Sequence, residues 1–284
     1  MTTSGPPQIW SSSDFPYMCL KDERRTRAFG DAITQTVTPG DVVVDVGAGS
    51  GILSLFAASA GASRVYAVEV DHSLAAALRD TVALNGLDDV VTVVEGDAFH
   101  AHLPAGADVV VAEIIDTGLL DELQVPVLNH LRERGVVAAD TRLVPGRYRT
   151  DIQLVRTDNL YYGYRIVAPK HEWPFYAHAE GGWAPTSVVP VSDVVEVISH
   201  DFAAGAIDER VAVTRTFEIE PGERANALRL SGVITLCEGV TLGATNALNG
   251  DKIIPLHSEL TGEVRLELTY RLGGGLGSLA IRRR

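Results

Sequence analysis

Acidic residues at the ends of predicted strands, together with a glycine-rich turn, are the first sign of chemistry in this sequence. The turn follows the first strand directly and reads Asp45-Val46-Gly47-Ala48-Gly49-Ser50-Gly51. Glu69 ends the second strand, and Asp97, followed by Ala98, comes after the third. Glycines let the backbone approach a ligand closely and turn tightly into a helix. Because the carboxyl ends of neighbouring parallel strands border one crevice, we expect Asp45, Glu69 and Asp97 to meet there.

The turn has the pattern Gly-x-Gly-x-Gly and not the Gly-x-Gly-x-x-Gly of dinucleotide sites. Asp45 at its head would repel a pyrophosphate, whereas Glu69 can bind both ribose hydroxyls and Asp97 can face an adenine amino group. A nucleoside with a positive charge and an amino-acid tail fits these groups better than NAD. The alternative is a structural turn with solvated acids. We predict an S-adenosylmethionine site made by Asp45, Gly47, Gly49, Gly51, Glu69, Asp97 and Ala98.

A second pair of carboxylates, Glu113 and Glu122, lies nine residues apart after the fourth predicted strand. Glu113 follows that strand directly, so it should also point into the crevice. A loop with Gly118 at its middle can bring Glu122 back beside it. Clustered carboxylates share a proton or bind a cation, unless they belong to a solvated loop. The acidic bias of the chain favours a cation, and a guanidinium offers paired donors to both carboxylates.

Two fixed carboxylates beside a sulfonium suit methyl transfer to a guanidino nitrogen. They would hold the guanidinium plane and draw positive charge toward the nitrogens that do not react, which leaves the target nitrogen more nucleophilic. Orientation and preorganised charge would then supply most of the rate gain. A strong general base is less necessary, because the nitrogen becomes very acidic only after it is methylated.

The elements that position these residues alternate between strand and helix from residue 36 to residue 145. Short, apolar, β-branched runs are typical of buried parallel strands, and Asn85-Gly86 is a helix stop signal. This alternation predicts an α/β fold with a doubly wound, Rossmann-like sheet. The predicted strands span 42–46, 65–69, 90–94 and 108–112, and the predicted helices span 52–58, 74–85 and 125–134.

After about residue 145, prolines, glycines and β-rich runs become frequent, and Pro145-Gly146 marks the change. The predicted strands there span 152–155, 194–198, 211–219, 228–236 and 264–270. The last three suggest antiparallel pairing, so we expect a β-barrel or β-sandwich. The predicted domains are an N-terminal helical segment or lid over the cofactor at 1–35, a Rossmann-like domain at 36–145, and the antiparallel domain at 146–284.

Composition and charge exclude several classes of protein. The chain has 284 residues, of which 46% are hydrophobic and 21% charged, which is ordinary for a globular protein. No apolar run reaches the roughly 20 residues of a membrane helix. The net charge is −13, and residues 1–145 hold 9 basic and 20 acidic residues, which disfavours nucleic acid and favours a cationic partner. With only Cys19 and Cys237 and no visible secretory signal, we predict a cytoplasmic protein.

At this point the chain resembles the protein arginine methyltransferase family of class I S-adenosylmethionine-dependent methyltransferases. The resemblance rests on the glycine turn, on Glu69, on the spacing from Glu113 to Glu122, and on an N-terminal run. That run, Met18-Cys19-Leu20-Lys21-Asp22-Glu23-Arg24-Arg25-Thr26-Arg27, is similar to the family's Met-Leu-Lys-Asp-x-x-Arg-Thr helix. The resemblance implies that the two glutamates grip a substrate guanidinium, and that Arg25 binds the cofactor's carboxylate and helps to place Glu113.

Two segments depart from the family pattern. The family carries a Tyr-Phe-x-x-Tyr segment before the Met-Leu-Lys-Asp helix, but residues 9–15 contain no tyrosine. The family's Thr-His-Trp loop falls at Thr245-Asn246-Ala247, without the histidine and the aromatic wall. By the resemblance, Asn246 takes the place of the histidine and hydrogen-bonds Asp22, while Ala247 leaves the pocket open or differently filled. The altered pocket makes a small guanidine compound, such as free arginine, a candidate acceptor.

Seven of the chain's eighteen aromatic residues lie between 160 and 183. Such clusters fill a local core or an interface more often than they bind a cofactor. The resemblance implies a dimerisation arm at about 158–187 that packs on the nucleotide domain of a second subunit, so we expect a homodimer. A local core or a substrate cover is the alternative. His171 and His178 lie here without further ligands at suitable spacing, so we predict no metal site.

The leading hypothesis is an S-adenosylmethionine-dependent N-methyltransferase that monomethylates free L-arginine or a small arginine-like metabolite, with natural-product biosynthesis as one setting. The single methyl group rests on Glu-Ile-Ile-Asp-Thr-Gly-Leu-Leu-Asp-Glu, which is closest to the family branch that adds only one. The alternatives are arginine in a protein or peptide, an unrelated amine or hydroxyl, and a non-catalytic, cofactor-binding assembly domain. Retention of Arg25 with both glutamates argues against the last. The predicted catalytic residues are Glu113, Glu122, Asp22 and Asn246.

Overall fold

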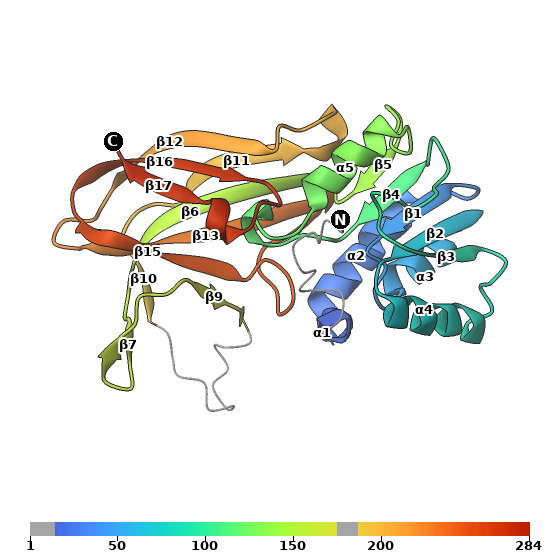
Figure 1. The fold of residues 1–284 in the computed structure, drawn as a ribbon, viewed down its shortest axis with the longest axis horizontal. Coiled ribbons are helices and arrows are strands. Elements are labelled where there is room, and N and C mark those ends of the chain that lie inside the picture. Colours follow the sequence, from blue (N-terminus) through green and yellow to red (C-terminus); the bar gives the residue numbers. More distant parts are fainter. Residues whose placement is uncertain (1–14, 175–186) are drawn as a thin grey trace, which may run out of the picture.

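The computed structural model describes residues 15–174 and 187–284 (Figure 1). Its first half is built on a parallel sheet with the strand order β3-β2-β1-β4-β5. This order reverses between β1 and β4, and such a reversal places a ligand crevice at the carboxyl ends of these strands. The predicted doubly wound, Rossmann-like fold is therefore confirmed. The strands are β1 (Val42–Val46), β2 (Arg64–Glu69), β3 (Val91–Glu95), β4 (Val109–Ala112) and β5 (Arg142–Val144).

Helices precede and connect these strands. They are α1 (Phe15–Lys21), α2 (Glu23–Thr36), α3 (Ile52–Ser59), α4 (His72–Leu84) and α5 (Gln124–Glu133). Gly51 precedes α3 with a φ of 82°, and a Cβ at this position would collide with Leu78 of α4. Only glycine suits both conditions. The chain can therefore turn directly from the end of β1 into α3.

Two antiparallel sheets form the second half, which confirms the predicted antiparallel domain. The larger follows the path β10-β6-β13-β15-β9, with β11 on β6 and β14 on β13, and the smaller follows β12-β16-β17. Buried residues of both sheets, such as Tyr148 and Leu268, belong to one core. The strands are β6 (Arg147–Thr157), β9 (Lys170–Glu172), β10 (Val188–Pro190), β11 (Val195–Asp201), β12 (Arg210–Glu218), β13 (Ala225–Cys237), β14 (Val240–Leu242), β15 (Asp251–Leu260), β16 (Glu263–Arg271) and β17 (Ala280–Arg283), with a hairpin of β7 (Leu160–Tyr161) and β8 (Tyr164–Arg165).

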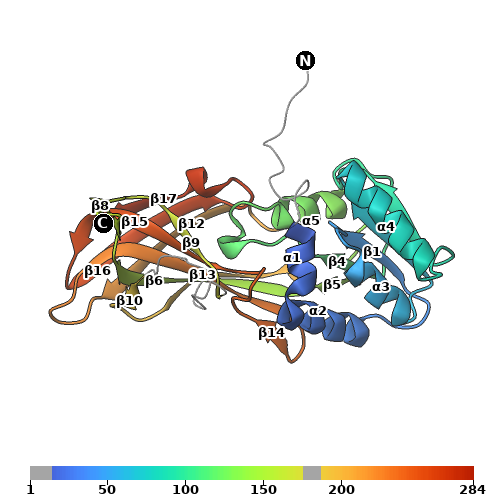
Figure 2. The same ribbon diagram turned by 90° about the horizontal axis from the view of Figure 1, so that it is seen from below.

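The two halves meet along α2 and along the segment that follows β4. The helix packs on β13 and β14, and a short 3-10 turn, η1 (Thr117–Leu119), packs on β6 and β13. Gly118 in this turn has a φ of 78°, and a Cβ there would lie 2.6 Å from Leu230 of β13. Figures 1 and 2 show the parallel sheet at one end of the molecule and the antiparallel sheets at the other. Residues 113–122 are therefore positioned by both halves.

The structure adds strands that the sequence pattern does not predict. The short β5 joins the parallel sheet, and the longer β15, which contains Pro255, joins the antiparallel one. The change of sheet falls between Val144 and Arg147, while the division into domains at 1–35, 36–145 and 146–284 stays a prediction. Residues 1–14 of the predicted N-terminal lid lie outside the described residues. Part of the aromatic arm, including residues 175, 176 and 183, also lies outside them. None of the described helices is long and apolar enough to cross a membrane.

Candidate active site

A cavity of about 530 Å³ opens at the carboxyl ends of β1, β2, β3 and β4. The glycine turn and Glu69 line one part of it, and the segment after β4 lines another. The antiparallel half contributes Ala247 and the run 273–275 to its wall. The structure thus brings into one cavity most of the predicted residues, namely Arg25, Gly47, Gly49, Glu69, Asp97, Ala98, Glu113 and Glu122.

The glycine turn is held by backbone hydrogen bonds that keep it open toward the cavity. The amides of Gly47 and Ala48 both donate to the carbonyl of Val68, at 3.0 and 2.9 Å. Gly47 has a φ of 74°, and a Cβ there would lie 2.6 Å from Ile114. Because a side chain would be strained and crowded at this position, the turn presents bare backbone to the cavity.

Two carboxylates beside the turn are fixed by backbone amides. Glu69 accepts from the amide of Gly49 at 2.8 Å and from the amide of Asp71 at 2.9 Å, one on each oxygen. Asp97 accepts from the amide of Phe99 at 3.0 Å. Each ionised carboxylate offers about four acceptor positions, so both side chains retain capacity for hydroxyl or amino donors.

Asp45 and Gly51, by contrast, do not line the described cavity, and their part in binding the cofactor stays a prediction. Asp45 is 1% exposed, and its Oδ2 accepts from the hydroxyl of Ser54 in α3 at 2.6 Å. Its side chain points from within β1 into the layer between the sheet and α3. Burial raises the pKa of Asp45 to about 6, and the neighbouring charges of Glu113 and Glu69 add to this rise.

Arg25, in the first turn of α2, contacts residues 113–122, which we call the acidic segment. It is 4% exposed, and its Nη2 donates to Oε2 of Glu113 in a close ion pair. Burial raises the pKa of Glu113, and the charge of Arg25 opposes that rise. The Nε of Arg25 is buried with no hydrogen-bond partner among the described residues. The predicted contact between Arg25 and Glu113 is therefore present, and Nη1 of Arg25, which has no hydrogen-bond partner among the described residues, remains for a ligand.

Glu122 faces the same cavity, but its carboxylate has no hydrogen bond or ion pair within the described ranges. Its backbone amide is fixed by Oδ1 of Asp116 at 3.1 Å. Burial raises the pKa of Glu122 well above its ordinary value, and the charges of Glu113 and Asp116 raise it further. A cation bound between the two glutamates would favour their ionised forms. The pair that the sequence predicts is thus brought together.

Asp22 connects α2 to the antiparallel half instead of lining the cavity. Its Oδ1 accepts from the amide of Arg25 at 3.1 Å and caps α2, and its Oδ2 accepts from the amide of Ala247 at 2.7 Å. The predicted hydrogen bond from Asn246 to Asp22 is wrong, because the Asn246 side chain is exposed and forms no hydrogen bond with the described residues. The backbone of the next residue takes that place, and Ala247 itself is buried against the cavity.

Residues 25–141 of the chain match the family model of the ribosomal protein L11 methyltransferases. The chain is 31% identical to an uncharacterized protein of Methanocaldococcus jannaschii over 93% of its length and 95% of that protein. It is 33% identical to the arginine N(omega)-methyltransferase of Streptomyces achromogenes subsp. streptozoticus, over 51% of this chain and 41% of that protein. It is 29% identical to protein arginine N-methyltransferase 1.1 of Arabidopsis thaliana, over 90% of this chain and 75% of that protein.

The chain belongs to the protein arginine methyltransferase family. It is an S-adenosylmethionine-dependent arginine methyltransferase of class I. The fold agrees with this assignment: the PRMT1 enzyme–prozyme heterotetrameric complex of Trypanosoma brucei with AdoHcy superposes with a TM-score of 0.74 at 20% identity, over 97% of this chain and 98% of that one.

The side chains of this arginine methyltransferase fit S-adenosylmethionine. The turn at Gly47 admits no Cβ and so allows close approach of a ligand to the backbone. The fixed carboxylate of Glu69 suits the two ribose hydroxyls, and the Nη1 donors of Arg25, which have no partner among the described residues, suit a carboxylate. Cys19 of α1 also lines the cavity, and burial, followed by the charge of Glu113, raises the pKa of its thiol to about 12, so it remains neutral.

The sequence pattern does not indicate the residues of the antiparallel half that hold the acidic segment. Tyr148 of β6 accepts from the amide of Gly118 at 2.8 Å, and Lys252 of β15 contacts Asp116 and Asp121. These partners are about 30 to 136 residues apart in the chain, so no local spacing reveals them. The run at 273–275 did carry a signal, because three consecutive glycines stand out in the sequence. The amide of Gly275 donates to the carbonyl of Leu120 at 2.7 Å.

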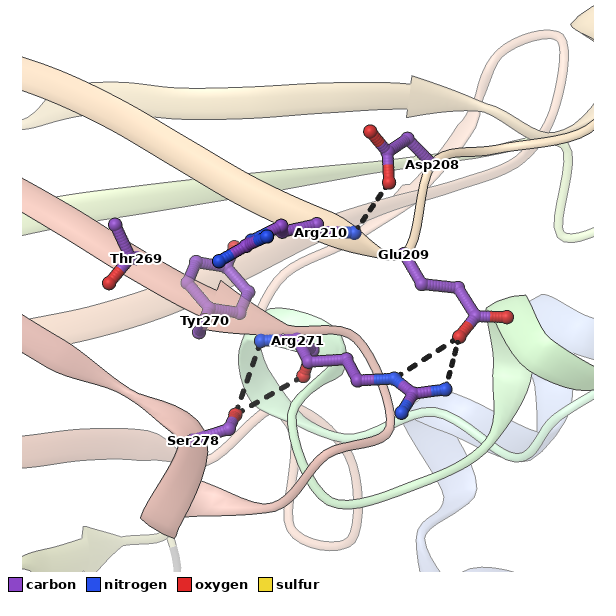
Figure 3. A pocket seen from close by; sticks show the side chains of 7 residues that line it. All are labelled: Asp208, Glu209, Arg210, Thr269, Tyr270, Arg271 and Ser278. Carbon is purple, nitrogen blue, oxygen red and sulfur yellow. Dashed lines mark hydrogen bonds and ion pairs between the residues drawn. The ribbon is translucent and has the colours of Figure 1, made fainter.

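A second hollow, of about 460 Å³, lies on the antiparallel half where β12 begins and β16 ends (Figure 3). Three of its charged side chains have partners: Arg271 pairs with Glu209 at 2.9 Å, and Asp208 accepts from the backbone amide of Arg210. None of the predicted site residues that the structure describes lines this hollow. The larger cavity is therefore the candidate active site.

Proposed function

We propose that this arginine methyltransferase transfers one methyl group to a guanidino nitrogen of a small acceptor, free L-arginine or an arginine-like metabolite. The observation that carries the proposal is the pair of carboxylates, Glu113 and Glu122, that face one cavity together with the glycine turn. A planar cation with paired donors is the ligand that two such carboxylates bind best.

The cofactor end of the cavity would be formed by residues of the parallel sheet. Glu69 would accept hydrogen bonds from the ribose hydroxyls, and Asp97 with Ala98 would border the adenine. The backbone at Gly47 and Gly49 would lie against the amino-acid tail, and Arg25 would bind its carboxylate through Nη1, which has no other partner among the described residues. When bound, S-adenosylmethionine supplies a sulfonium methyl, whose carbon–sulfur bond breaks as the guanidino nitrogen forms its new carbon–nitrogen bond.

The acceptor end depends on the different environments of the two glutamates. Glu113 is fixed by Arg25, so it would set the orientation of the guanidinium plane. Glu122 has a raised pKa and no partner within the described part of the chain, so it would gain most from a bound cation. Together they would hold positive charge on the nitrogens that do not react. The reacting nitrogen would be left more nucleophilic, and it would release its proton to solvent after methylation.

Two findings support a small acceptor. The Streptomyces relative carries the name arginine N(omega)-methyltransferase. In addition, the wall that the antiparallel half gives to the cavity is made of Ala247 and three glycines, with no aromatic side chain from residues 15–174 and 187–284 at that place. The single methyl group remains a prediction from the run between Glu113 and Glu122.

The second candidate is methylation of arginine within a protein or peptide. It is favoured by the long alignment with protein arginine N-methyltransferase 1.1, which covers 90% of this chain. In either case we propose a homodimer formed through the arm at about 158–187. Its described part includes Tyr162 and Tyr164, which are 95% and 72% exposed on the hairpin of β7 and β8. The cytoplasmic location also stays a prediction from the sequence.

The direct test is an acceptor panel with methyl-labelled S-adenosylmethionine. Free L-arginine, small guanidino compounds, arginine-containing peptides and histone-like proteins would be compared by kcat/KM, with mass analysis of every product. We expect the label in a monomethylated small guanidine. Preferential labelling of peptides or proteins would overturn the small acceptor. Labelling of none of these, with cofactor binding intact, would favour a non-catalytic assembly domain.

A further inference from the structure

Lys252 is a buried cation of the antiparallel half that contacts the acidic segment, residues 113–122. It lies on β15, and its side chain is 7% exposed. Its Nζ donates to Oδ2 of Asp116, to Oδ2 of Asp121 at 2.8 Å, and to the carbonyl of Thr117 at 3.1 Å. An ammonium group has three N–H donors, so every donor of Lys252 is used on this one segment.

Asp116 passes this attachment on to Glu122. Its Oδ2 binds Lys252, while its Oδ1 accepts from the backbone amides of Asp121 and Glu122 at 3.0 and 3.1 Å. One carboxylate therefore joins β15 to the amide of the glutamate that faces the acceptor. Asp121 makes a second connection, because its Oδ1 accepts from the amide of Leu276 at 2.9 Å.

The charges in this cluster also act on Glu122. Burial alone would lower the pKa of Lys252, but Asp116 and Asp121 raise it above its ordinary value, so the lysine stays protonated. Burial, Glu113 and Asp116 raise the pKa of Glu122, and the charge of Lys252 opposes that rise. The lysine thus offsets two carboxylates that would otherwise disfavour an ionised Glu122.

We propose that Lys252 is a positioning residue of the methyl-transfer site, which holds the segment carrying Glu122 through Asp116 and Asp121 and keeps that glutamate directed at the acceptor. This inference rests on the proposed function, in which Glu122 contacts the guanidinium. It assigns to the antiparallel half a direct part in the reaction, because the attachment comes from a strand about 130 residues away in the chain.

The test uses the full-length chain with three variants. Lys252→Met keeps the length of the side chain and removes its charge and donors, and Lys252→Arg keeps the charge. Arg224→Met is the matched control, since the Arg224 side chain is 67% exposed and pairs only with Glu259 of β15 among the described residues. The measurements are kcat and KM for the acceptor, affinity for S-adenosylhomocysteine by calorimetry, and amide hydrogen exchange of the peptide covering 113–123.

For Lys252→Met we expect kcat to fall about 10²-fold, since a small displacement of a positioned group has an effect of that order. Affinity for S-adenosylhomocysteine should stay within about twofold, because no cofactor-turn residue contacts Lys252 in the described structure, and exchange at 113–123 should accelerate. Lys252→Arg should recover part of kcat, and Arg224→Met should leave all three measurements unchanged. This pattern separates a positioning role from a general loss of stability, which would also weaken cofactor binding.

Removal of Lys252 alone leaves the buried carboxylate of Asp116 without its cation, which destabilises a protein, whereas the side chain of Asp121 is 33% exposed. The double variant Lys252→Met with Asp116→Asn removes that buried charge and serves if the single variant does not fold. It should show the same fall in kcat and faster exchange. Unchanged kcat and exchange in the folded Lys252 variants, or an equal effect of Arg224→Met, would overturn the inference. If the parent methylates no guanidino compound, the proposed function fails, and hydrogen exchange still decides whether Lys252 holds the segment.

Discussion

Replacing Glu122 with glutamine changes the charge of the acceptor site and almost nothing else. The amide side chain has the same shape and still accepts a hydrogen bond, and the backbone amide at this position keeps its bond to Asp116. Because Glu122 makes no side-chain bond within the described residues, its substitution should not disturb the packing of the segment. Any loss of activity in Glu122→Gln can therefore be attributed to the charge.

The size of the effect follows from the geometry of the pair. A guanidinium about 4 Å from a carboxylate gains about 4 kcal/mol at an effective dielectric constant of about 20. Part of this gain is offset by the cost of burying the carboxylate, whose pKa is already raised. Glu113 remains in place and keeps part of the orientation. We therefore expect about 3 to 4 kcal/mol of lost transition-state stabilisation, which corresponds to a fall in kcat/KM of about 10²- to 10³-fold.

The assay is initial-rate methyl transfer from labelled S-adenosylmethionine to the best acceptor of the panel. Calorimetry with S-adenosylhomocysteine should give a Kd within about twofold of the parent, because Glu122 lies outside the cofactor turn. Glu133→Gln is the matched control, since this glutamate ends α5 with its side chain 79% exposed. If Glu122→Gln kept kcat/KM within about threefold of the parent, the carboxylate clamp would be refuted.

Three further changes probe other parts of the structure. Gly47→Ala should weaken binding of S-adenosylhomocysteine about tenfold or more in calorimetry, because its Cβ would lie 2.6 Å from Ile114 at a φ of 74°; unchanged affinity would contradict this. Without ligand, the raised pKa of Asp45, about 6 instead of 3.8, means that folding stability is lost as pH rises through this range. Asp45→Asn should therefore stabilise the protein by about 3 kcal/mol at pH 8 and about half of that at pH 5, measured by denaturant unfolding; an equal gain at both would be against it. Tyr162→Ser combined with Tyr164→Ser should give a monomer in light scattering, whereas a surviving dimer would exclude the hairpin from the interface.

The sequence predicts well what depends on local pattern. Apolar β-branched runs mark four of the parallel strands, and the acids at their carboxyl ends, Glu69 at the end of β2 and Glu113 directly after β4, do reach the cavity. The two glutamates at nine-residue spacing are brought together because Gly118 allows a turn with positive φ between them. In these cases the position of each acidic side chain is determined by residues close to it in the sequence.

The sequence predicts poorly what depends on the direction of one side chain or on distant contacts. Asp45 lies within β1 and not after it, so its side chain goes to Ser54 of α3 and not to the ligand crevice. The predicted bond from the Asn246 side chain to Asp22 is not formed, because the backbone amide of Ala247 donates to Asp22 instead. A backbone amide requires no particular side chain, so the sequence does not indicate it. Lys252 and Asp116 come together only when the antiparallel sheet packs against the segment that follows β4. No local motif in the sequence therefore predicts their ion pair.

The most direct test of the carboxylate clamp is a crystal structure of the chain with S-adenosylhomocysteine and the preferred guanidino acceptor. The account predicts that Glu113 and Glu122 both contact the guanidinium at about 2.7 to 2.9 Å, the distance of charge-assisted hydrogen bonds. One guanidino nitrogen should face the sulfur. A complex in which the acceptor lies elsewhere, with Glu113 and Glu122 turned away from it, would contradict the account.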